Sequence, residues 1–272
     1  MDKQFFTLYN GLKIPAIGFG TWQIKNDIVK DACLTALKEG YRHIDTAKAY
    51  GNEKGVGESL KECGLTREDV FITSKIPAEI KDYEDAKRCI RESLELLDTK
   101  YIDLMLIHAP RPWEEMANRN GHRYFKENIE VYRALEEAFE EGLLKSIGVS
   151  NFDIDDLNNI IKNNKIKPMV NQICIFAGCT PTDLIDYCKN NNILVEAYSP
   201  LATGRLFDKP LIIDMAKKYN VSIAKLAIRY CYQLDTLPLP KSITPSRIKE
   251  NLDIFDFEIS EEDMKILKNI SF

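Results

Sequence analysis

The stretch YRHIDTAKAYGNEKGVGESLKEC, residues 41–63, contains a short strand, a polar loop and an amphipathic helix in that order. Tyr41 and Ile44 favour a strand at 41–45, and apolar residues recur at helical spacing through 53–63. The same alternation of short strand and longer helical segment repeats along the chain. Strands are expected at 16–20, 41–45, 71–74, 102–107, 146–149, 169–172, 194–197 and 236–239.

Helices are expected between and after these strands. They occupy residues 27–39, 53–63, 83–98, 126–141, 153–163, 182–190, 222–233 and 245–251, with an additional C-terminal helix at 261–269. Parallel strands joined by crossover helices form α/β sheets, and eight such strands close a barrel. We therefore expect a (β/α)8 TIM barrel. No linker interrupts the alternation, so residues 1–272 are expected to form a single domain.

The first residues predict a β-hairpin ahead of the barrel. Segments 5–9 and 12–14 flank Asn10-Gly11, a pair that suits a tight two-residue turn because both residues tolerate positive φ. The alternative fold is an open doubly wound sheet, which usually carries G-x-G-x-x-G after its first strand. Gly18-Phe19-Gly20-Thr21 lacks the third glycine, and no helix follows it at once. The barrel is therefore favoured.

The composition argues against several classes of protein. A formal net charge of -5 and a pI of about 5.5 disfavour a nucleic-acid binder, which needs clustered lysine and arginine. No apolar run approaches the roughly 18 residues of a membrane span, and the N-terminus lacks the apolar segment of a signal peptide. The seven cysteines contain no C-x-x-C pair, which predicts free thiols and no metal site. We expect a cytoplasmic protein.

Polar side chains follow the predicted strands at the ends where (β/α)8 barrels build their active sites. A single Asp or Lys at such a position is usually a solvated loop residue. Here the second to eighth strands all carry polar residues, which is harder to dismiss. They are Asp45 and Tyr50, Lys75, His108, Ser150 and Asn151, Asn171 and Gln172, Tyr198 and Ser199, and Lys241 and Ser242.

Asp45, Tyr50, Lys75 and His108 make chemical sense together for reducing a carbonyl, which needs hydride at carbon and a proton at oxygen. A tyrosine, with an ordinary pKa of about 10, is a poor acid at neutral pH unless a nearby ammonium favours its phenolate. Lys75 would supply that ammonium and lower the pKa, and Asp45 would hold it in place. A neutral His108 would orient the substrate oxygen. His43 is expected to be structural.

Two segments resemble signatures of the aldo-keto reductases. Residues 40–57, GYRHIDTAKAYGNEKGVG, match the first signature, and residues 239–251, LPKSITPSRIKEN, match the cofactor signature. Shorter matches follow in family order. They are Gly20-Thr21-Trp22, LIHAP at 106–110, GVSNF at 148–152, VNQ at 170–172 and AYSPL at 197–201. The chain is identified as a member of that family, of bacterial type with a short C-terminal tail.

The resemblance implies a barrel whose N-terminal hairpin covers the bottom and which binds NADPH in an extended form. It implies that Asp45, Tyr50, Lys75 and His108 are the catalytic tetrad. It also implies a set of cofactor contacts. These are Gly20, Thr21 and Trp22, then Ser150, Asn151 and Gln172 at the carboxamide, Tyr198 stacked on the nicotinamide, Ser199 and Leu201 along the pyrophosphate, Lys241, Ser242 and Arg247 at the 2′-phosphate, and Glu250 and Asn251 at the adenine. Independently, two cations and a hydroxyl at a helix start suit a phosphate, which favours NADPH over NADH.

Departures from the family pattern cluster on the substrate side. Ala109 stands where the family commonly has Trp, and 173–178 replaces a common Glu followed by His-Pro. The sequence also stops soon after the helix at 261–269. We therefore expect a wider or partner-completed pocket, lined by Trp22, Tyr50, His108, Ala109 and Trp113.

The long loop at 111–128 carries Arg111, Arg119 and Arg123, and allows two interpretations. It is either a solvated surface loop or a lid with affinity for acidic groups.

These observations predict an NADPH-dependent oxidoreductase that reduces an aldehyde, ketone or keto-sugar. Its expected partner is a small molecule rather than nucleic acid or membrane, and its expected state is a monomer or weak homodimer. One alternative is a dehydrogenase working in the oxidative direction. Another is a non-catalytic nucleotide-binding regulatory barrel, against which the complete tetrad argues.

Overall fold

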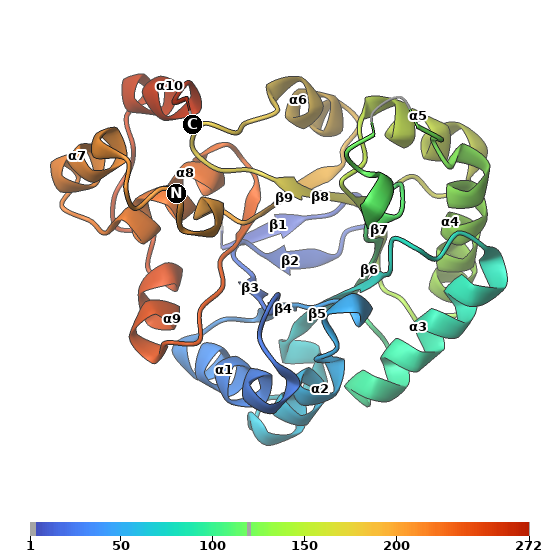
Figure 1. The fold of residues 1–272 in the computed structure, drawn as a ribbon. Helices are drawn as coiled ribbons and strands as arrows, with labels where there is room; N and C mark the ends of the chain where they lie inside the picture. Colours follow the sequence, from blue (N-terminus) through green and yellow to red (C-terminus); the bar gives the residue numbers. More distant parts are fainter. Residues whose placement is uncertain (1–3, 119–120, 272) are drawn as a thin grey trace.

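Eight parallel strands form one curved sheet with helices around its outside (Figure 1). The structure is a computed structural model in which residues 4–118 and 121–271 are described. The strand order is β10-β9-β8-β7-β6-β5-β4-β3, so each strand pairs with its neighbour in the sequence. The strands are β3 (Phe19–Gly20), β4 (His43–Asp45), β5 (Phe71–Ile76), β6 (Leu104–Ile107), β7 (Ile147–Ser150), β8 (Val170–Cys174), β9 (Leu194–Tyr198) and β10 (Leu237–Leu239). The predicted (β/α)8 barrel is confirmed.

The helices agree with the sequence pattern, with one addition. The expected ones are α1 (Asn26–Glu39), α2 (Glu53–Glu62), α3 (Tyr83–Leu97), α4 (Phe125–Glu140), α5 (Ile154–Asn163), α6 (Thr182–Asn190), α8 (Ile223–Gln233), α9 (Pro245–Leu252) and α10 (Glu261–Lys268). The unexpected helix is α7 (Pro210–Lys218), which begins at a proline in the first turn. Within 4–118 and 121–271, none of the helices has the length and apolar character that spanning a bilayer requires.

Helix α3 shows why these segments are helical and pack on the barrel. The Asp82 side chain caps its start by accepting a 2.9 Å hydrogen bond from the backbone N–H of Asp85. The residues that α3 buries recur three or four positions apart and form one stripe. They are Ala86, Cys89, Ile90, Ser93 and Leu97.

Backbone hydrogen bonds between the first and last strands close the barrel. The N–H of Gly18 donates to the carbonyl of Pro238 at 3.1 Å, and the N–H of Gly20 donates to that of Pro240 at 2.9 Å. Gly18 permits this approach, because a Cβ there would lie 2.4 Å from Leu239 Cδ2 and 2.6 Å from His43 Nδ1. Any larger residue would have to displace both side chains.

The N-terminal hairpin of β1 (Phe5–Thr7) and β2 (Lys13–Pro15) covers the bottom of the barrel, as predicted. The Tyr9 hydroxyl donates to the carbonyl of Lys167 at 2.6 Å, and Asn10 Nδ2 donates to that of Lys145 at 3.1 Å. Both carbonyls lie ahead of the strands β8 and β7, at the end opposite the strand carboxyl termini.

The prediction that a two-residue turn connects the strands of this hairpin is wrong. The N–H of Leu8 bonds to the carbonyl of Leu12 at 2.9 Å, which leaves three residues, 9–11, in the turn. Within the turn, Gly11 takes a positive φ of 87° and Asn10 does not. This is the arrangement of a three-residue loop that ends in a left-handed glycine.

Candidate active site

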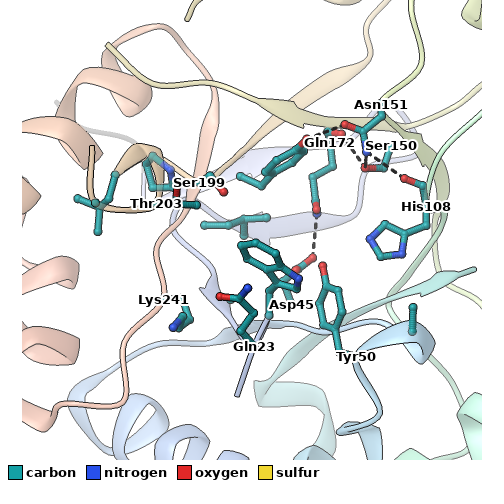
Figure 2. A pocket seen from close by; sticks show the side chains of 18 of the residues that line it. Gln23, Asp45, Tyr50, His108, Ser150, Asn151, Gln172, Ser199, Thr203 and Lys241 are labelled. Atoms are coloured by element: carbon teal, nitrogen blue, oxygen red, sulfur yellow. Dashed lines mark hydrogen bonds between the residues drawn. The ribbon is translucent and has the colours of Figure 1, made fainter. Parts of the chain in front are cut away.

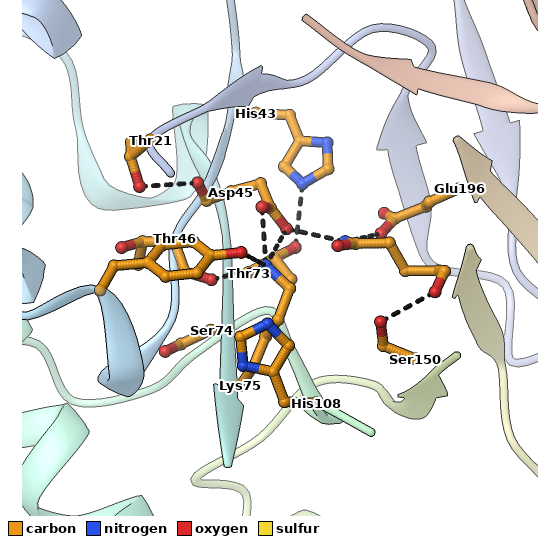
Figure 3. Close-up of polar contacts among 12 residues, drawn as sticks. Thr21, His43, Asp45, Thr46, Thr73, Ser74, Lys75, His108, Ser150 and Glu196 are labelled. Carbon is orange, nitrogen blue, oxygen red and sulfur yellow. Dashed lines mark hydrogen bonds and ion pairs between the residues drawn. The ribbon is translucent and has the colours of Figure 1, made fainter. Parts of the chain in front are cut away.

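Asp45 and Lys75 meet at the carboxyl ends of two neighbouring strands. Asp45 ends β4 and Lys75 lies near the end of β5, in parallel register. Lys75 Nζ donates to both Asp45 oxygens, at 2.7 and 2.8 Å, and to the backbone carbonyl of Thr46 at 2.8 Å (Figure 3). Lys75 is fully buried. Its ammonium therefore depends on these three oxygens in place of water.

Tyr50 lies above this pair, at the end of the 3-10 helix η1 (Lys48–Tyr50), with its hydroxyl 3.4 Å from Lys75 Nζ. Asn52 fixes the loop that carries it. Its Nδ2 donates to the carbonyls of Thr21 and Ile24 at 3.0 and 2.9 Å, and its Oδ1 accepts from the Thr46 hydroxyl at 2.7 Å. The position of the phenol is thus set by a fully buried amide.

The expected lowering of the Tyr50 pKa is not found. Burial raises the pKa of Tyr50 above its ordinary value, Lys75 opposes that rise, and the Asp45 carboxylate adds to it. Desolvation therefore outweighs the ammonium, and Tyr50 is a protonated phenol at neutral pH. Burial also opposes the charge of Lys75, but attraction to Asp45 and Tyr50 raises its pKa.

His108 follows β6 and is neutral at physiological pH. Burial, with a smaller contribution from Lys75, lowers its pKa to about 3. Its ring makes edge contacts with Tyr50 at 5.5 Å and with Trp113 at 5.1 Å between centroids. Its Nδ1 has no hydrogen-bond partner among the described residues.

A cavity of about 760 Å³ opens above these groups (Figure 2). It extends from Tyr50 and His108 past the ends of β7, β8 and β9 toward Lys241. The predicted residues that line it are Gly20, Trp22, Asp45, Tyr50, His108, Trp113, Ser150, Asn151, Gln172, Tyr198, Ser199, Leu201 and Lys241. Residues not foreseen in its wall include Gln23, Ala49, Thr203 and Phe207.

Other predicted residues do not line the cavity. Lys75 lies beneath the cavity floor and is fully buried. Thr21 is also buried, and its hydroxyl donates a 3.0 Å hydrogen bond to the backbone carbonyl of Asp45. Four more, which the resemblance implied for the cofactor, follow β10 at or near α9: Ser242, Arg247, Glu250 and Asn251. Among these, Ser242 accepts a 3.1 Å bond from the N–H of Thr244 just before α9.

Ala109 was expected in the pocket, and this prediction is wrong. It is fully buried, does not line the cavity, and its carbonyl accepts from Lys81 Nζ at 3.1 Å. Trp113, from the 3-10 helix η3 (Trp113–Glu115), forms an aromatic wall beside His108 instead. The loop after β6 thus supplies a large aromatic side chain to the cavity wall, and Ala109 does not widen the pocket.

The arginines of that loop are engaged in structural contacts. Arg111 is buried, and its Nη1 donates to the carbonyl of Asn118 at 2.6 Å. Arg123 pairs with Asp153 and Asp156 at 2.6 and 2.9 Å. Arg119 lies outside the described residues. A lid that captures acidic groups through Arg111 or Arg123 therefore has no support.

The polar groups at the ends of β7 and β9 hold one another in fixed orientations. The Asn151 amide donates to the His108 carbonyl at 3.0 Å and accepts from the Tyr198 hydroxyl at 2.8 Å (Figure 2). The Ser150 hydroxyl donates to the Gln172 carbonyl at 2.8 Å. The Tyr198 ring is thereby fixed against the cavity wall.

Glu196 is a buried acidic residue that sequence reasoning missed. Gln172 Nε2 donates to Glu196 Oε2 at 2.7 Å and to Asp45 Oδ2 at 2.8 Å (Figure 3). Glu196 is fully buried, and burial, together with repulsion from Asp45, raises its pKa to about 8. The signal in the sequence was a glutamate in an apolar strand, two residues before Tyr198 and hence on the same face.

Comparison with known proteins identifies the family. The profile of the Aldo/keto reductase family matches residues 16–271. Glyoxal reductase from Bacillus subtilis (strain 168) is 41% identical over 263 residues, covering 96% of this chain and 91% of that protein. The aldo/keto reductase from Brucella melitensis has a TM-score of 0.89 at 39% identity, covering 97% and 98% of the two chains. The Bombyx mori aldo-keto reductase in complex with NADP has a TM-score of 0.88 at 31% identity, covering 98% and 92%.

The chain therefore belongs to the aldo/keto reductase family. The predictions of the family and of an NADP(H)-dependent oxidoreductase acting on carbonyl compounds are confirmed.

Proposed function

We propose that this protein reduces a small aldehyde or ketone with NADPH and that Tyr50 donates the proton. The observation that carries the proposal is the stack of Asp45, Lys75 and Tyr50 at the cavity floor, with 2.7 Å and 3.4 Å between successive polar atoms. The phenol borders the cavity and the ammonium lies behind it. A proton can thus leave toward a ligand while the charge left behind faces Lys75.

The cofactor site fits NADPH in the chemistry of its residues. Both amide hydrogens of Gln172 are donated to carboxyl groups, so its oxygen is left as an acceptor at the cavity wall for a carboxamide. Tyr198 offers a fixed aromatic face there. Lys241 and Arg247 are exposed, and neither has an ion pair within the described chain.

The start of α9 completes the phosphate end of this site. The backbone N–H groups of Ser246 and Arg247 make no hydrogen bond to the described residues. Unpaired N–H groups at a helix start, with two cations, favour a phosphate such as the 2′-phosphate. NADPH, when bound, supplies the hydride.

The remaining chemistry belongs to side chains of this chain. Tyr50 gives its proton to the substrate oxygen, and Lys75 stabilises the phenolate because its ammonium is held by Asp45. His108 is neutral, so it can donate one hydrogen bond to that oxygen without adding a charge that would repel Lys75. Trp22 and Trp113 add apolar aromatic surface to the cavity wall for the substrate to contact.

The raised pKa of Tyr50 keeps the phenol in the protonated form at neutral pH. A protonated phenol is the form that reduction consumes, whereas oxidation of an alcohol needs the phenolate as base. Among the residues described in 4–118 and 121–271, the cavity wall contains one cation, Lys241, at the end away from Tyr50, which supports an uncharged substrate. Together with the similarity to a glyoxal reductase, this favours small neutral aldehydes and 2-oxoaldehydes.

A panel assay tests the proposal. Purified protein with NADPH is given glyoxal, methylglyoxal, a simple aldehyde, a keto-sugar and a carboxylated aldehyde, and loss of cofactor absorbance is followed. We expect turnover of the neutral aldehydes, with the carboxylated one slower. Tight NADPH binding without turnover of any compound would contradict the proposal and favour a non-catalytic regulatory barrel.

A further inference from the structure

Glu196 is a second carboxyl group beneath the proposed active site, in addition to Asp45. It lies on β9 opposite Gln172 of β8 and Leu237 of β10. Its side chain is fully buried. A buried carboxylate normally requires a cation or several donors. Glu196 Oε2 has one donor, Gln172, and Oε1 has no hydrogen-bond partner among the described residues.

The charges around Glu196 are already balanced without it. Asp45 and Lys75 form an ion pair on β4 and β5. Other ionisable groups on these elements include His43 on β4, Cys174 on β8, Tyr50 in η1 and Tyr198 on the same strand as Glu196. Burial lowers the pKa of His43 to about 3 and raises the pKa of Cys174, Tyr50 and Tyr198, so all four are uncharged at neutral pH. An ionised Glu196 would leave a net negative charge in the barrel interior.

The bond to Gln172 shows what the carboxyl group does. Gln172 Nε2 reaches Asp45 and Glu196 together, at 2.8 and 2.7 Å (Figure 3). An amide turned the other way would place its oxygen against the Asp45 carboxylate. The amide is therefore held with its oxygen free at the cavity wall.

We propose that Glu196 is a positioning residue for the reaction: as a neutral carboxylic acid it fixes the Gln172 amide and leaves the Asp45–Lys75 pair without a second negative charge. The inference rests on the proposed function for its effect on rate, but not for its effect on Gln172 or on the ionisation of the cluster.

A pH dependence follows from the same geometry. As pH rises through about 8, Glu196 loses its proton and a second negative charge appears near Lys75. That charge attracts the ammonium and opposes ionisation of Tyr50. In the wild type, the Tyr50 phenolate should therefore form at a higher pH than in a variant whose residue 196 cannot ionise.

Glu196→Gln tests this directly, since glutamine resembles the protonated acid and cannot ionise. At pH 6.5 the variant should bind NADPH and turn over within about twofold of wild type. We expect the inflection near pH 8 in the wild-type profile of kcat/KM to disappear, and the tyrosinate absorbance of the cofactor-free protein to rise at lower pH. Glu196→Ala, which removes the support of Gln172, should weaken NADPH binding about tenfold, an order typical of a lost hydrogen bond at a buried site.

Glu136→Gln is the matched control. Glu136 is also buried, and it accepts from the N–H of Ile166 at 2.6 Å, ahead of β8 on the far side of the barrel from the cavity. The Glu136→Gln variant should leave the pH profile of kcat/KM and the tyrosinate titration unchanged. Infrared difference spectra between pH 7 and pH 9.5 supply a readout without substrate. A protonated-carboxyl band should vanish with rising pH in wild type and Glu136→Gln, and be missing in Glu196→Gln.

Persistence of the inflection and of the infrared band in Glu196→Gln would overturn the inference. If that variant does not fold, wild-type protein labelled with carboxyl-13C glutamate decides, because absence of any glutamate titrating above pH 7 would equally overturn it. Failure of the wild type to reduce any carbonyl would instead refute the proposed function, and the infrared and NADPH-binding results would still stand.

Discussion

Lys75 Nζ lies 2.7 Å from Asp45 Oδ1 and 2.8 Å from Asp45 Oδ2, so one ammonium is held by both oxygens of one carboxylate inside the barrel. The pair stands on adjacent strands, and Tyr50 is within 3.4 Å of the ammonium on the cavity side. This contact couples the stability of the barrel to its proposed chemistry.

Asp45→Asn should lower the free energy of unfolding substantially. It leaves the Lys75 ammonium buried without its counter-ion, and breaking a buried pair typically lowers the free energy of unfolding by about 3–5 kcal/mol. Urea unfolding at pH 7 measures the loss. Asp98→Asn is the control, since Asp98 pairs with Lys61 on the exposed surface and should change stability by about 0–1 kcal/mol. Equal losses in the two variants would contradict the assigned role of the buried pair.

Lys241→Ala should discriminate between the two nicotinamide cofactors. Lys241 lines the far end of the cavity, and a charged hydrogen bond to a phosphate contributes about 1.5–3 kcal/mol. The Kd for NADPH should therefore rise about 10–100-fold while that for NADH stays within twofold. Fluorescence titration measures both. Lys249→Ala, whose lysine is exposed and 4.0 Å from Glu39, should change neither, and equal weakening of both cofactors by Lys241→Ala would refute the phosphate assignment.

Trp113→Ala should affect substrate rather than cofactor. Trp113 stands edge-on to His108 at the cavity wall and is 43% exposed. Removing a partly buried aromatic contact of about 1–2 kcal/mol should raise the KM for aldehydes about tenfold. NADPH affinity should stay as in wild type. Phe255→Ala, at an exposed aromatic packed on Tyr232, is the control, and a shared effect on KM would count against the wall assignment.

Acid should destabilise the protein through its buried imidazoles. Burial lowers the pKa of His43 and His108 to about 3, below the unfolded value of about 6.5. Between these values the unfolded chain binds more protons, so the free energy of unfolding falls as pH drops from 6.5 toward 3. His43→Gln, which can keep the bond to the Thr73 hydroxyl, should show a shallower fall. Urea titrations at pH 7, 5.5 and 4.5 test this, and an unchanged slope would contradict it.

Most of the barrel could be predicted because each strand and helix has its own periodicity. Helix α7 was missed although Pro210 in its first turn and the buried Ile212, Met215 and Ala216 are helix signals. It follows an irregular loop in which Ser199, Ala202 and Thr203 have positive φ. Such a loop has no sequence period. The hairpin turn was mispredicted because Asn10-Gly11 suits both a two-residue and a three-residue loop, and the pairing of Leu8 with Leu12 decides between them.

The grouping of Asp45, Tyr50, Lys75 and His108 could be predicted from the sequence because each residue lies beside a strand end, where the topology brings distant residues together. How the surrounding loops pack against these residues could not be predicted. The burial of Ala109 and the approach of Trp113 depend on how the loop after β6 folds back. The pKa of Tyr50 likewise depends on how much water its surroundings exclude, and the order of residues does not encode that balance.

Tyr50→Phe tests the central claim most directly. The substitution removes the hydroxyl beside Lys75 and keeps the ring that packs on His108. With NADPH and the best aldehyde of the panel, kcat should fall about 10²–10⁴-fold, the range expected for loss of a general acid. The Kd for NADPH by fluorescence should remain within about twofold of wild type. Retention of wild-type kcat in Tyr50→Phe would show that the proton comes from another group.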